Sequence, residues 1–346
     1  MMGITIIDIA KKAGVSPSTV SRVIANHPRI SSATKHKVMK IMKELDYHPN
    51  MIARSLASKS SKIIGVIIPG TAERSFQHPF FPELLRGIGS VAYQHGYNIL
   101  ISSVTSLEEE KDTIIQFARG GITDGVILLT SRVQDPSVAE LIKMSSPFVI
   151  IGRSELESRV NWVDNDNYLI GYELTEHFIK QGHRRIVFLG LSPDFLVTVD
   201  RFNGYKQALQ DHGIPVDEKL VVESQFVSGD GYHLMKTFYS QRSVKPTGVI
   251  ACDDLLAFGA IKYLNEHGLE VPRDVAVAGV NNVPQAAYFS PALTSVEINA
   301  FSLGAKAVEL LLTEVNEEYT TGVPHTRSYS RTIIPAELIV RDSTRK

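Results

Sequence analysis

The chain has 346 residues, with 36 lysines and arginines against 37 aspartates and glutamates, and a formal net charge of −1. Its length is enough for more than one domain with a core of its own. The single cysteine, Cys252, excludes a disulfide framework and a cysteine-based zinc cluster, which favours a cytoplasmic protein. We find no long apolar stretch and no cleavable leader, so neither a membrane span nor export is expected. Nothing in the sequence points to a cofactor or a bound metal.

The first 26 residues predict a helix-turn-helix, in which the second of two short helices enters the major groove of DNA. Apolar residues at helical spacing predict the first helix over Ile6–Ala13, with Thr5 as its N-cap. Gly14 can take the left-handed conformation that ends this helix. Ser16 as N-cap and Pro17 at the first helical position open the second helix.

The second helix has a polar face that a small core would not use. Its apolar face contains Val20, Val23 and Ile24. Short hydroxyl side chains let a helix approach phosphates and base edges, and an arginine can bind guanine through two acceptors. The predicted DNA contacts in this region are Thr5, Ser16, Pro17, Ser18, Thr19, Ser21, Arg22 and Asn26. The alternative is a helical hairpin whose polar face is merely solvated.

The head of the chain continues with a third amphipathic helix and a linker. Residues 32–46 place Val38, Ile41, Met42 and Leu45 on one helical face. A break at 47–50 leads to a short helical pattern that fades into the Ser/Lys-rich linker 58–62.

Charge divides the chain at this linker. Residues 1–62 contain 11 lysines and arginines and three acidic residues, a net charge of +8, so the rest of the chain carries −9. A basic head on an acidic body is expected of a protein that contacts DNA phosphates.

After residue 62, short runs rich in valine and isoleucine alternate with helical patterns. The predicted buried strands are 63–68, 98–102, 125–129, 147–151, 186–190, 220–222, 247–251 and 275–280. The predicted helices are 81–95, 107–120, 137–145, 168–181, 200–212, 229–239 and 254–267. Such alternation predicts parallel sheets covered by helices on both faces, and the number of strands suggests two lobes.

Ligands of open α/β sheets bind beyond the carboxyl ends of the strands, which points to one cleft between the lobes. Carboxylate, amide and guanidinium groups suit sugar hydroxyls, and aromatic rings suit the faces of a sugar. The candidate effector-binding residues are Phe80, Phe81, Arg153, Arg201, Phe226, Asp253, Asp254 and Asn281. Three alternatives remain open, with Asp254 as a helix cap, Phe226 as a core residue and Arg201 in a salt bridge between lobes.

A series of distinct sequence motifs extends along nearly the whole chain. They begin with GITIIDIAKKAGVSPSTVSRVIAN and continue with LDYHPN, ARSL and IGVIIP around the linker. Later motifs are DGVILL, GHRRIVFLG, RFNGY, ACDDLLAFGA, VAVAGVNN and PALTSVEIN. Together they are very specific, and by them the chain resembles the lac repressor/galactose repressor family of bacterial transcription regulators.

The resemblance implies a small all-α helix-turn-helix DNA-binding domain and a two-lobed α/β domain like a periplasmic binding protein. The expected boundaries are 1–49 for the headpiece, 50–62 for a hinge helix and linker, and 63–342 for effector binding and dimerisation. The lobes are expected at about 63–160 with 296–322, and at about 164–291 with 326–342. Three crossovers would then lie near Val160–Asp164, Pro291–Ser295 and Gly322–Thr326.

The resemblance also assigns residue roles. In the hinge it implies DNA contacts by Asn50, Ala53, Leu56 and Ala57, with Leu56 as an apolar wedge in the minor groove. Arg201 of RFNGY matches the family's sugar-contacting arginine, and Asp253 matches a ligand-contacting amide or carboxylate. Asn281 departs from the aspartate of many sugar-responsive members. Asp164 and Asp166 are interpreted as hinge and helix-start residues.

We therefore expect a repressor of a carbohydrate-utilisation operon that a sugar releases from a near-palindromic operator. The segments PSTVSRVI and HPFFPELLRGI resemble maltose-operon repressors of Gram-positive bacteria, which implies maltose or a maltodextrin. The chain has no trailing leucine heptad, so a homodimer is expected.

Other functions remain to be weighed. Within the family, a carbon-catabolite regulator would use a phosphorylated carrier protein as its co-effector. The DNA-binding head opposes a periplasmic binding protein. The sequence has no phosphate-binding loop, dinucleotide-binding glycine motif or serine-hydrolase motif, which opposes an enzyme.

Overall fold

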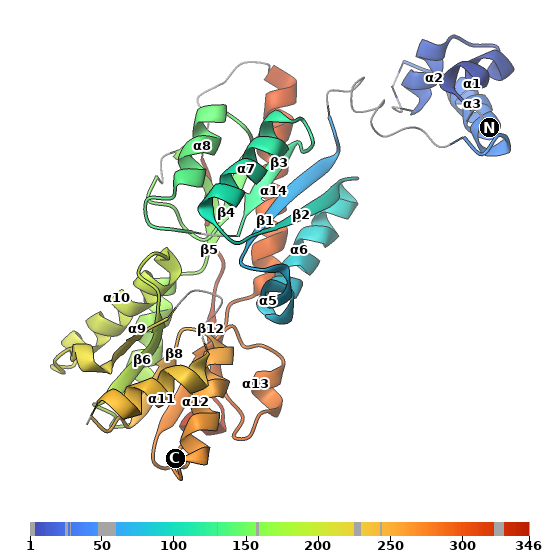
Figure 1. The fold of residues 1–346 in the computed structure, drawn as a ribbon. Helices are drawn as coiled ribbons and strands as arrows, with labels where there is room; N and C mark the ends of the chain where they lie inside the picture. Colours follow the sequence, from blue (N-terminus) through green and yellow to red (C-terminus); the bar gives the residue numbers. More distant parts are fainter. Residues whose placement is uncertain are drawn as a thin grey trace. The chain divides into compact units, whose positions relative to one another are not determined.

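The computed structural model describes residues 4–24, 27, 29–47, 60–129, 131–156, 159–224, 230–242, 244–321 and 329–345. Contacts divide the chain into two units, Met1–Lys62 and Ile63–Lys346. Each unit is described by itself (Figure 1).

The first unit contains three helices that follow the predicted pattern, α1 (Ile6–Ala13), α2 (Pro17–Ile24) and α3 (Ser32–Glu44). Thr5 caps α1 in a reciprocal capping box with Asp8, and its backbone N–H donates to Asp8 Oδ2 at 2.9 Å. Gly14 ends α1 with φ of 64°, a left-handed conformation that favours glycine. The three helices enclose a core made of Ile9, Ala10, Ala13, Val20, Val23, Val38, Ile41 and Met42.

The second unit contains two sheets, each with six strands within the described residues. The first sheet has the order β11-β5-β4-β3-β1-β2 and is parallel throughout. Its strands are β1 (Ile63–Pro69), β2 (Asn98–Val104), β3 (Gly125–Leu128), β4 (Phe148–Ile151), β5 (Asn161–Asp164) and β11 (Arg331–Ile333).

The second sheet has the order β12-β10-β9-β8-β6-β7, and only its β12–β10 pair is antiparallel. Its strands are β6 (Ile186–Leu191), β7 (Val221–Glu223), β8 (Gly248–Ala251), β9 (Ala276–Val280), β10 (Thr294–Glu297) and β12 (Glu337–Ile339). The two sheets confirm the predicted two-lobed α/β architecture.

Helices cover both faces of each sheet, so each lobe has two cores (Figure 1). The first lobe contains α5 (Ala72–Gln77), α6 (Phe80–Gln94), α7 (Leu107–Arg119), α8 (Pro136–Met144) and α14 (Ala300–Thr321). The second contains α9 (Asn167–Lys180), α10 (Leu196–Asp211), α11 (Gly231–Gln241), α12 (Asp254–Glu266) and α13 (Gln285–Tyr288). Within the described parts of the chain, no helix is both long and apolar enough to span a membrane.

Helices α9 and α10 approach each other closely at two glycines. A Cβ atom on Gly204 would lie 2.0 Å from the backbone oxygen of Tyr168, and one on Gly171 would lie 1.9 Å from that of Arg201. Only glycine fits such an approach without displacing backbone. The two glycines therefore fix the position of Arg201, on α10, against the second sheet.

The crossovers between the lobes differ from the predicted positions. The chain crosses at 165–166 after β5, at 298–299 after β10, and at 334–336 between β11 and β12. The expected crossover Val160–Asp164 falls mostly within β5, and Pro291–Ser295 ends in the first two residues of β10. Each of these strands joins its sheet before the chain crosses. The expected crossover Gly322–Thr326 lies outside the described residues. The expected second-lobe segment 326–342 is wrong for β11, which pairs with β5 in the first sheet, whereas β12 pairs with β10 in the second sheet as expected.

Candidate effector cleft and nucleic-acid interface

The polar face of α2 is available to a partner of the first unit. Val20 and Val23 are buried, whereas Ser16, Pro17, Ser18 and Arg22 are exposed. Thr19 and Ser21 are half-buried, and Thr5 is exposed at the start of α1.

Ser16 caps α2 as predicted, because the backbone N–H of Thr19 donates to Ser16 Oγ at 3.1 Å. The Oγ atoms of Ser16 and Ser18 are also hydrogen bonded, at 2.8 Å. The remaining predicted DNA contacts, Asn26, Asn50, Ala53, Leu56 and Ala57, lie outside the described residues.

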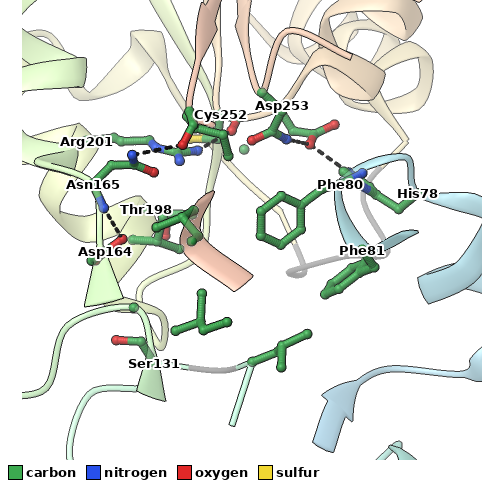
Figure 2. A pocket seen from close by; sticks show the side chains of 18 of the residues that line it. His78, Phe80, Phe81, Ser131, Asp164, Asn165, Thr198, Arg201, Cys252 and Asp253 are labelled. Carbon is green, nitrogen blue, oxygen red and sulfur yellow. Dashed lines mark hydrogen bonds and ion pairs between the residues drawn. The ribbon is translucent and has the colours of Figure 1, made fainter. Parts of the chain in front are cut away.

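A cavity of about 170 Å³ lies between the lobes of the second unit (Figure 2). Its wall contains five of the eight predicted effector residues: Phe80, Phe81, Arg201, Asp253 and Asn281. They come from the start of α6, from α10, and from the chain directly after β8 and β9. The wall therefore collects residues from both lobes at the carboxyl ends of strands.

Asp253 is a carboxylate of this wall with three hydrogen-bond partners. Its Oδ1 accepts the backbone N–H of Leu255 at 2.6 Å, which caps α12. Its Oδ2 accepts the side-chain amide of Asn281 at 2.6 Å and lies 2.7 Å from His78 Nε2 (Figure 2). The contact with His78 crosses from the second lobe to the first.

Arg201 is buried, and its guanidinium is held within the second lobe. Nε donates to Asn167 Oδ1 at 2.9 Å, and Nη1 donates to the backbone oxygen of Cys252 at 2.6 Å. Both acceptors are uncharged and belong to the second lobe, so these bonds do not form the salt bridge between lobes that was an alternative. The arginine is fixed at the cavity wall by neutral partners.

The two phenylalanines form the apolar side of the cavity (Figure 2). Their rings meet edge to face, with centroids 5.1 Å apart. Phe81 is buried in the core of the first lobe, whereas Phe80 packs against a core cluster of each lobe. The contacts of Phe80 therefore depend on the relative position of the lobes.

Arg153 and Asp254 require correction, because neither belongs to the cavity wall. The Arg153 guanidinium forms an ion pair with Asp200 of the second lobe, in which Nη2 donates to Oδ1 at 2.7 Å. Asp254 is fully buried and accepts Ser295 Oγ–H at 2.6 Å and the backbone N–H of Val283 at 2.8 Å. Burial raises the pKa of Asp254 well above its ordinary value. Phe226 lies outside the described residues.

Several residues of the cavity wall were not predicted as effector contacts: His78, Ser131, Asp164, Asn165, Thr198 and Cys252. His78 offered a signal, because it lies two residues before the predicted aromatic pair. Asp164 ends β5, a strand that the sequence pattern did not predict. Burial raises the pKa of Asp164 to about 6, although three donors, the backbone N–H groups of Arg153 and Asn165 and the amide of Asn167, oppose the shift.

No cluster of three or more histidine, cysteine or acidic side chains suited to a metal ion occurs among the residues that the structure describes.

A helix-turn-helix with an exposed polar helix, joined in one chain to a two-lobed unit with a cavity between its lobes, defines a DNA-binding transcription regulator. Residues 5–50 match the lacI family of bacterial regulatory proteins, and residues 175–344 match a periplasmic binding protein-like domain. The chain belongs to the lacI family, as its motifs predicted.

Relatives over nearly the whole chain agree with this assignment. The transcriptional regulator MalR of Streptococcus pneumoniae serotype 4 is 40% identical over 91% of this chain and 94% of its own. Catabolite control protein A of Priestia megaterium is 31% identical over 92% of this chain and 94% of its own. These relatives are regulators, which confirms the prediction that the chain is not an enzyme.

Two solved structures have the same fold. The regulator CelR in complex with cellobiose has a TM-score of 0.75 and 30% identity, and the alignment covers 98% of this chain and 99% of CelR. A lac repressor dimer bound to operator and the anti-inducer ONPF has a TM-score of 0.83 and 23% identity, and covers 99% of each chain.

Proposed function

We propose that this regulator represses a carbohydrate-utilisation operon in the bacterial cytoplasm. As a homodimer it binds a near-palindromic operator through α2 and the segment 50–58, and a sugar, maltose or a maltodextrin, releases it. The observation that carries the proposal is the composition of the cavity, in which the aromatic pair Phe80 and Phe81 lines the same space as Arg201, Asp253 and Asn281.

This composition suits a neutral sugar. Carboxylate and guanidinium groups hydrogen bond to vicinal hydroxyls, and aromatic rings cover the apolar face of a pyranose. A structural neighbour was solved in complex with the disaccharide cellobiose, and a relative at 40% identity is named MalR. The cellobiose complex supports an oligosaccharide as the effector.

The arrangement also supports a route from ligand to DNA. The wall contains residues of both lobes and of the crossover at 165–166, so a bound sugar would prefer one arrangement of the lobes over others. A coupling of about 1–3 kcal/mol between the sugar and operator sites is typical of such regulators.

Exposed apolar residues support the homodimer. In the second unit, Tyr93 and Tyr288 are 84% and 89% exposed, and Phe76 is also exposed. The helices that contain Phe76, Tyr93 and Tyr288 (α5, α6 and α13) lie on the same side of the unit in Figure 1. A second copy of the chain would bury such residues.

Isothermal titration calorimetry tests the ligand assignment, using maltose, maltotriose, cellobiose and glucose 6-phosphate. We expect maltose or maltotriose to bind, and Asp253→Asn to weaken that binding by roughly tenfold or more. Asp230→Asn is the matched control, because Asp230 also caps a second-lobe helix but does not line the cavity. Absence of binding by every sugar contradicts the proposal and favours a phosphorylated carrier protein as the effector. Equal sugar binding by Asp253→Asn and the wild type contradicts the assignment of the sugar to this cavity.

A further inference from the structure

His78 connects the two lobes through a side-chain contact. It lies between α5 and α6 of the first lobe, and its Nε2 is 2.7 Å from Oδ2 of Asp253 at the start of α12 in the second lobe. Only 13% of the histidine side chain and 20% of the aspartate side chain are exposed. The rings of Phe80 and Phe81 pack edge-on against the imidazole, with the Phe81 centroid at 5.8 Å.

The contacts between the lobes near Ser131 are of a different kind. The backbone N–H of Leu196 donates to Ser131 O, and that of Val133 donates to Asp194 O, both at 3.0 Å. Arg153 and Asp200 form an ion pair beside them. Neither backbone groups nor an arginine change protonation near neutral pH. The pair of His78 and Asp253 can change protonation in that range.

Asp253 depends on His78 for its orientation. Its Oδ2 atom is held by His78 and by the Asn281 amide, while Oδ1 is engaged with the backbone of Leu255. A carboxylate fixed at both oxygens presents its remaining lone pairs in defined directions. A ligand hydroxyl would meet those lone pairs in the cavity that Asp253 lines.

We infer that His78 is a positioning residue of the effector cleft, which in its protonated form joins the lobes and orients Asp253, so that effector binding takes up a proton. This inference rests on the proposed function of the cleft, and it adds a residue and a pH dependence to that function. The role of His78 goes beyond packing, because its charge state controls the contact with Asp253.

The direction of the pH dependence follows from the surroundings of His78. Burial lowers the pKa of His78, but the charge and the hydrogen bond of Asp253 raise it more, so the net pKa lies above the ordinary 6.5. When the lobes separate, the ring meets water and its pKa returns toward the ordinary value. The joined form is therefore favoured fully below pH 6.5, and this advantage is lost as the pH rises through the raised pKa.

Other charged groups near the cleft set the pH range of an experiment. Asp164 and Arg201 line the same cavity, and Glu73 and Arg74 are exposed on the neighbouring α5. Asp164 has a pKa of about 6, so measurements between pH 6.5 and 8.5 keep it mainly ionised. Over that range we expect His78 to change its charge, while Asp164 stays mainly ionised.

The test uses the full chain and the variant His78→Gln, which keeps a hydrogen-bond donor for Asp253 but cannot titrate. His95→Gln is the control, because His95 is exposed at the end of α6 and does not line the cavity. We expect the maltose affinity of the wild type and of His95→Gln to fall by roughly fivefold between pH 6.5 and pH 8.5, and that of His78→Gln to stay constant. An equal slope in His78→Gln would overturn the inference.

A second measurement does not require any sugar. Histidine-selective NMR, with the His78 signal assigned by its loss in His78→Gln, gives the pKa of His78 directly. We expect a pKa above the ordinary value in the wild type and a clear decrease in Asp253→Asn. An ordinary pKa of His78 in both proteins would overturn the inference. If NMR shows the raised pKa of His78 but maltose binds no variant, the proposed sugar is wrong and the contact between His78 and Asp253 stands.

Discussion

The side-chain amide of Asn165 donates a hydrogen bond to the backbone oxygen of Ile334, at 2.8 Å. The same amide donates to the backbone oxygen of Ile298 at 3.0 Å. These three residues lie on the three connections between the lobes, at 165–166, 298–299 and 334–336. One buried amide thus ties together all the segments about which the lobes can turn.

Replacement of Asn165 by alanine leaves two carbonyl groups without their donor. We expect Asn165→Ala to lower the free energy of unfolding by about 2 kcal/mol, because groups that lose a buried partner keep their desolvation cost. Urea unfolding of the full chain measures this, with the exposed Asn98→Ala as the control. If both variants lose the same stability, the amide of Asn165 is not the tie between the crossovers.

The close approach of α9 and α10 makes a second prediction. Gly204→Ala places a methyl group 2.0 Å from the backbone oxygen of Tyr168, so we expect a loss of roughly 2–4 kcal/mol in the free energy of unfolding. Gly89→Ala is the matched control, because its methyl group on α6 would lie 3.7 Å from Ile99, an ordinary contact. Thermal unfolding compares the stability of the two variants. If Gly204→Ala loses no more stability than Gly89→Ala, then α9 and α10 can move apart without cost.

Asp164 predicts a pH dependence of stability. Its folded pKa of about 6 lies above the ordinary 3.8, so between these values the folded protein binds a proton that the unfolded chain does not. The contribution of Asp164 to stability therefore decreases as the pH rises from 4 to 6, by up to about 3 kcal/mol, and stays low above pH 6.

The variant Asp164→Asn isolates this contribution, since an amide does not titrate. Urea unfolding at pH 7 and at pH 4.5 compares the stability of the variant with that of the wild type. We expect the variant to be more stable, relative to the wild type, at pH 7 than at pH 4.5. A difference between variant and wild type that is independent of pH would mean that Asp164 has the same pKa in both states.

Much of this fold follows from local sequence patterns, and the exceptions share one cause. Strands such as β1 and β8 are short runs of valine and isoleucine between helical patterns, so their period and burial were visible. The strands β5 and β10, with sequences NWVD and TSVE, have no such run. They extend each sheet because a neighbouring strand accepts their hydrogen bonds, and this tertiary effect moved the first two crossovers from their predicted places. The third crossover moved because β11 joins the first sheet.

The cavity likewise combines features that the sequence predicted with features set by tertiary contacts. Phe80, Phe81, Asp253 and Asn281 follow predicted strands, and the rule for the carboxyl ends of strands was enough to bring them together. Arg153 and Asp254 satisfy the same rule but turn to Asp200 and Ser295 instead. Side-chain direction depends on partners distant in the sequence, and for that reason the role of His78 toward Asp253, 175 residues away, was not predicted.

The exposed Arg22 on α2 gives a prediction for DNA binding. Arg22→Ala is expected to weaken specific operator binding by about 1–3 kcal/mol, since an arginine that binds a guanine edge contributes that much to discrimination. Filter binding at several salt concentrations measures it, with Arg119→Ala on α7 as the control on the second unit. Unchanged operator affinity in Arg22→Ala would remove this residue from the interface.

We propose that a sugar in the cleft controls the binding of DNA by the first unit. The most direct test is fluorescence anisotropy of a labelled, near-palindromic operator duplex, titrated with the full-length protein and then with a sugar panel led by maltose. We expect tight operator binding that weakens with rising salt, and release of the operator by maltose or a maltodextrin but not by unrelated sugars. Tight binding that no sugar changes would contradict it.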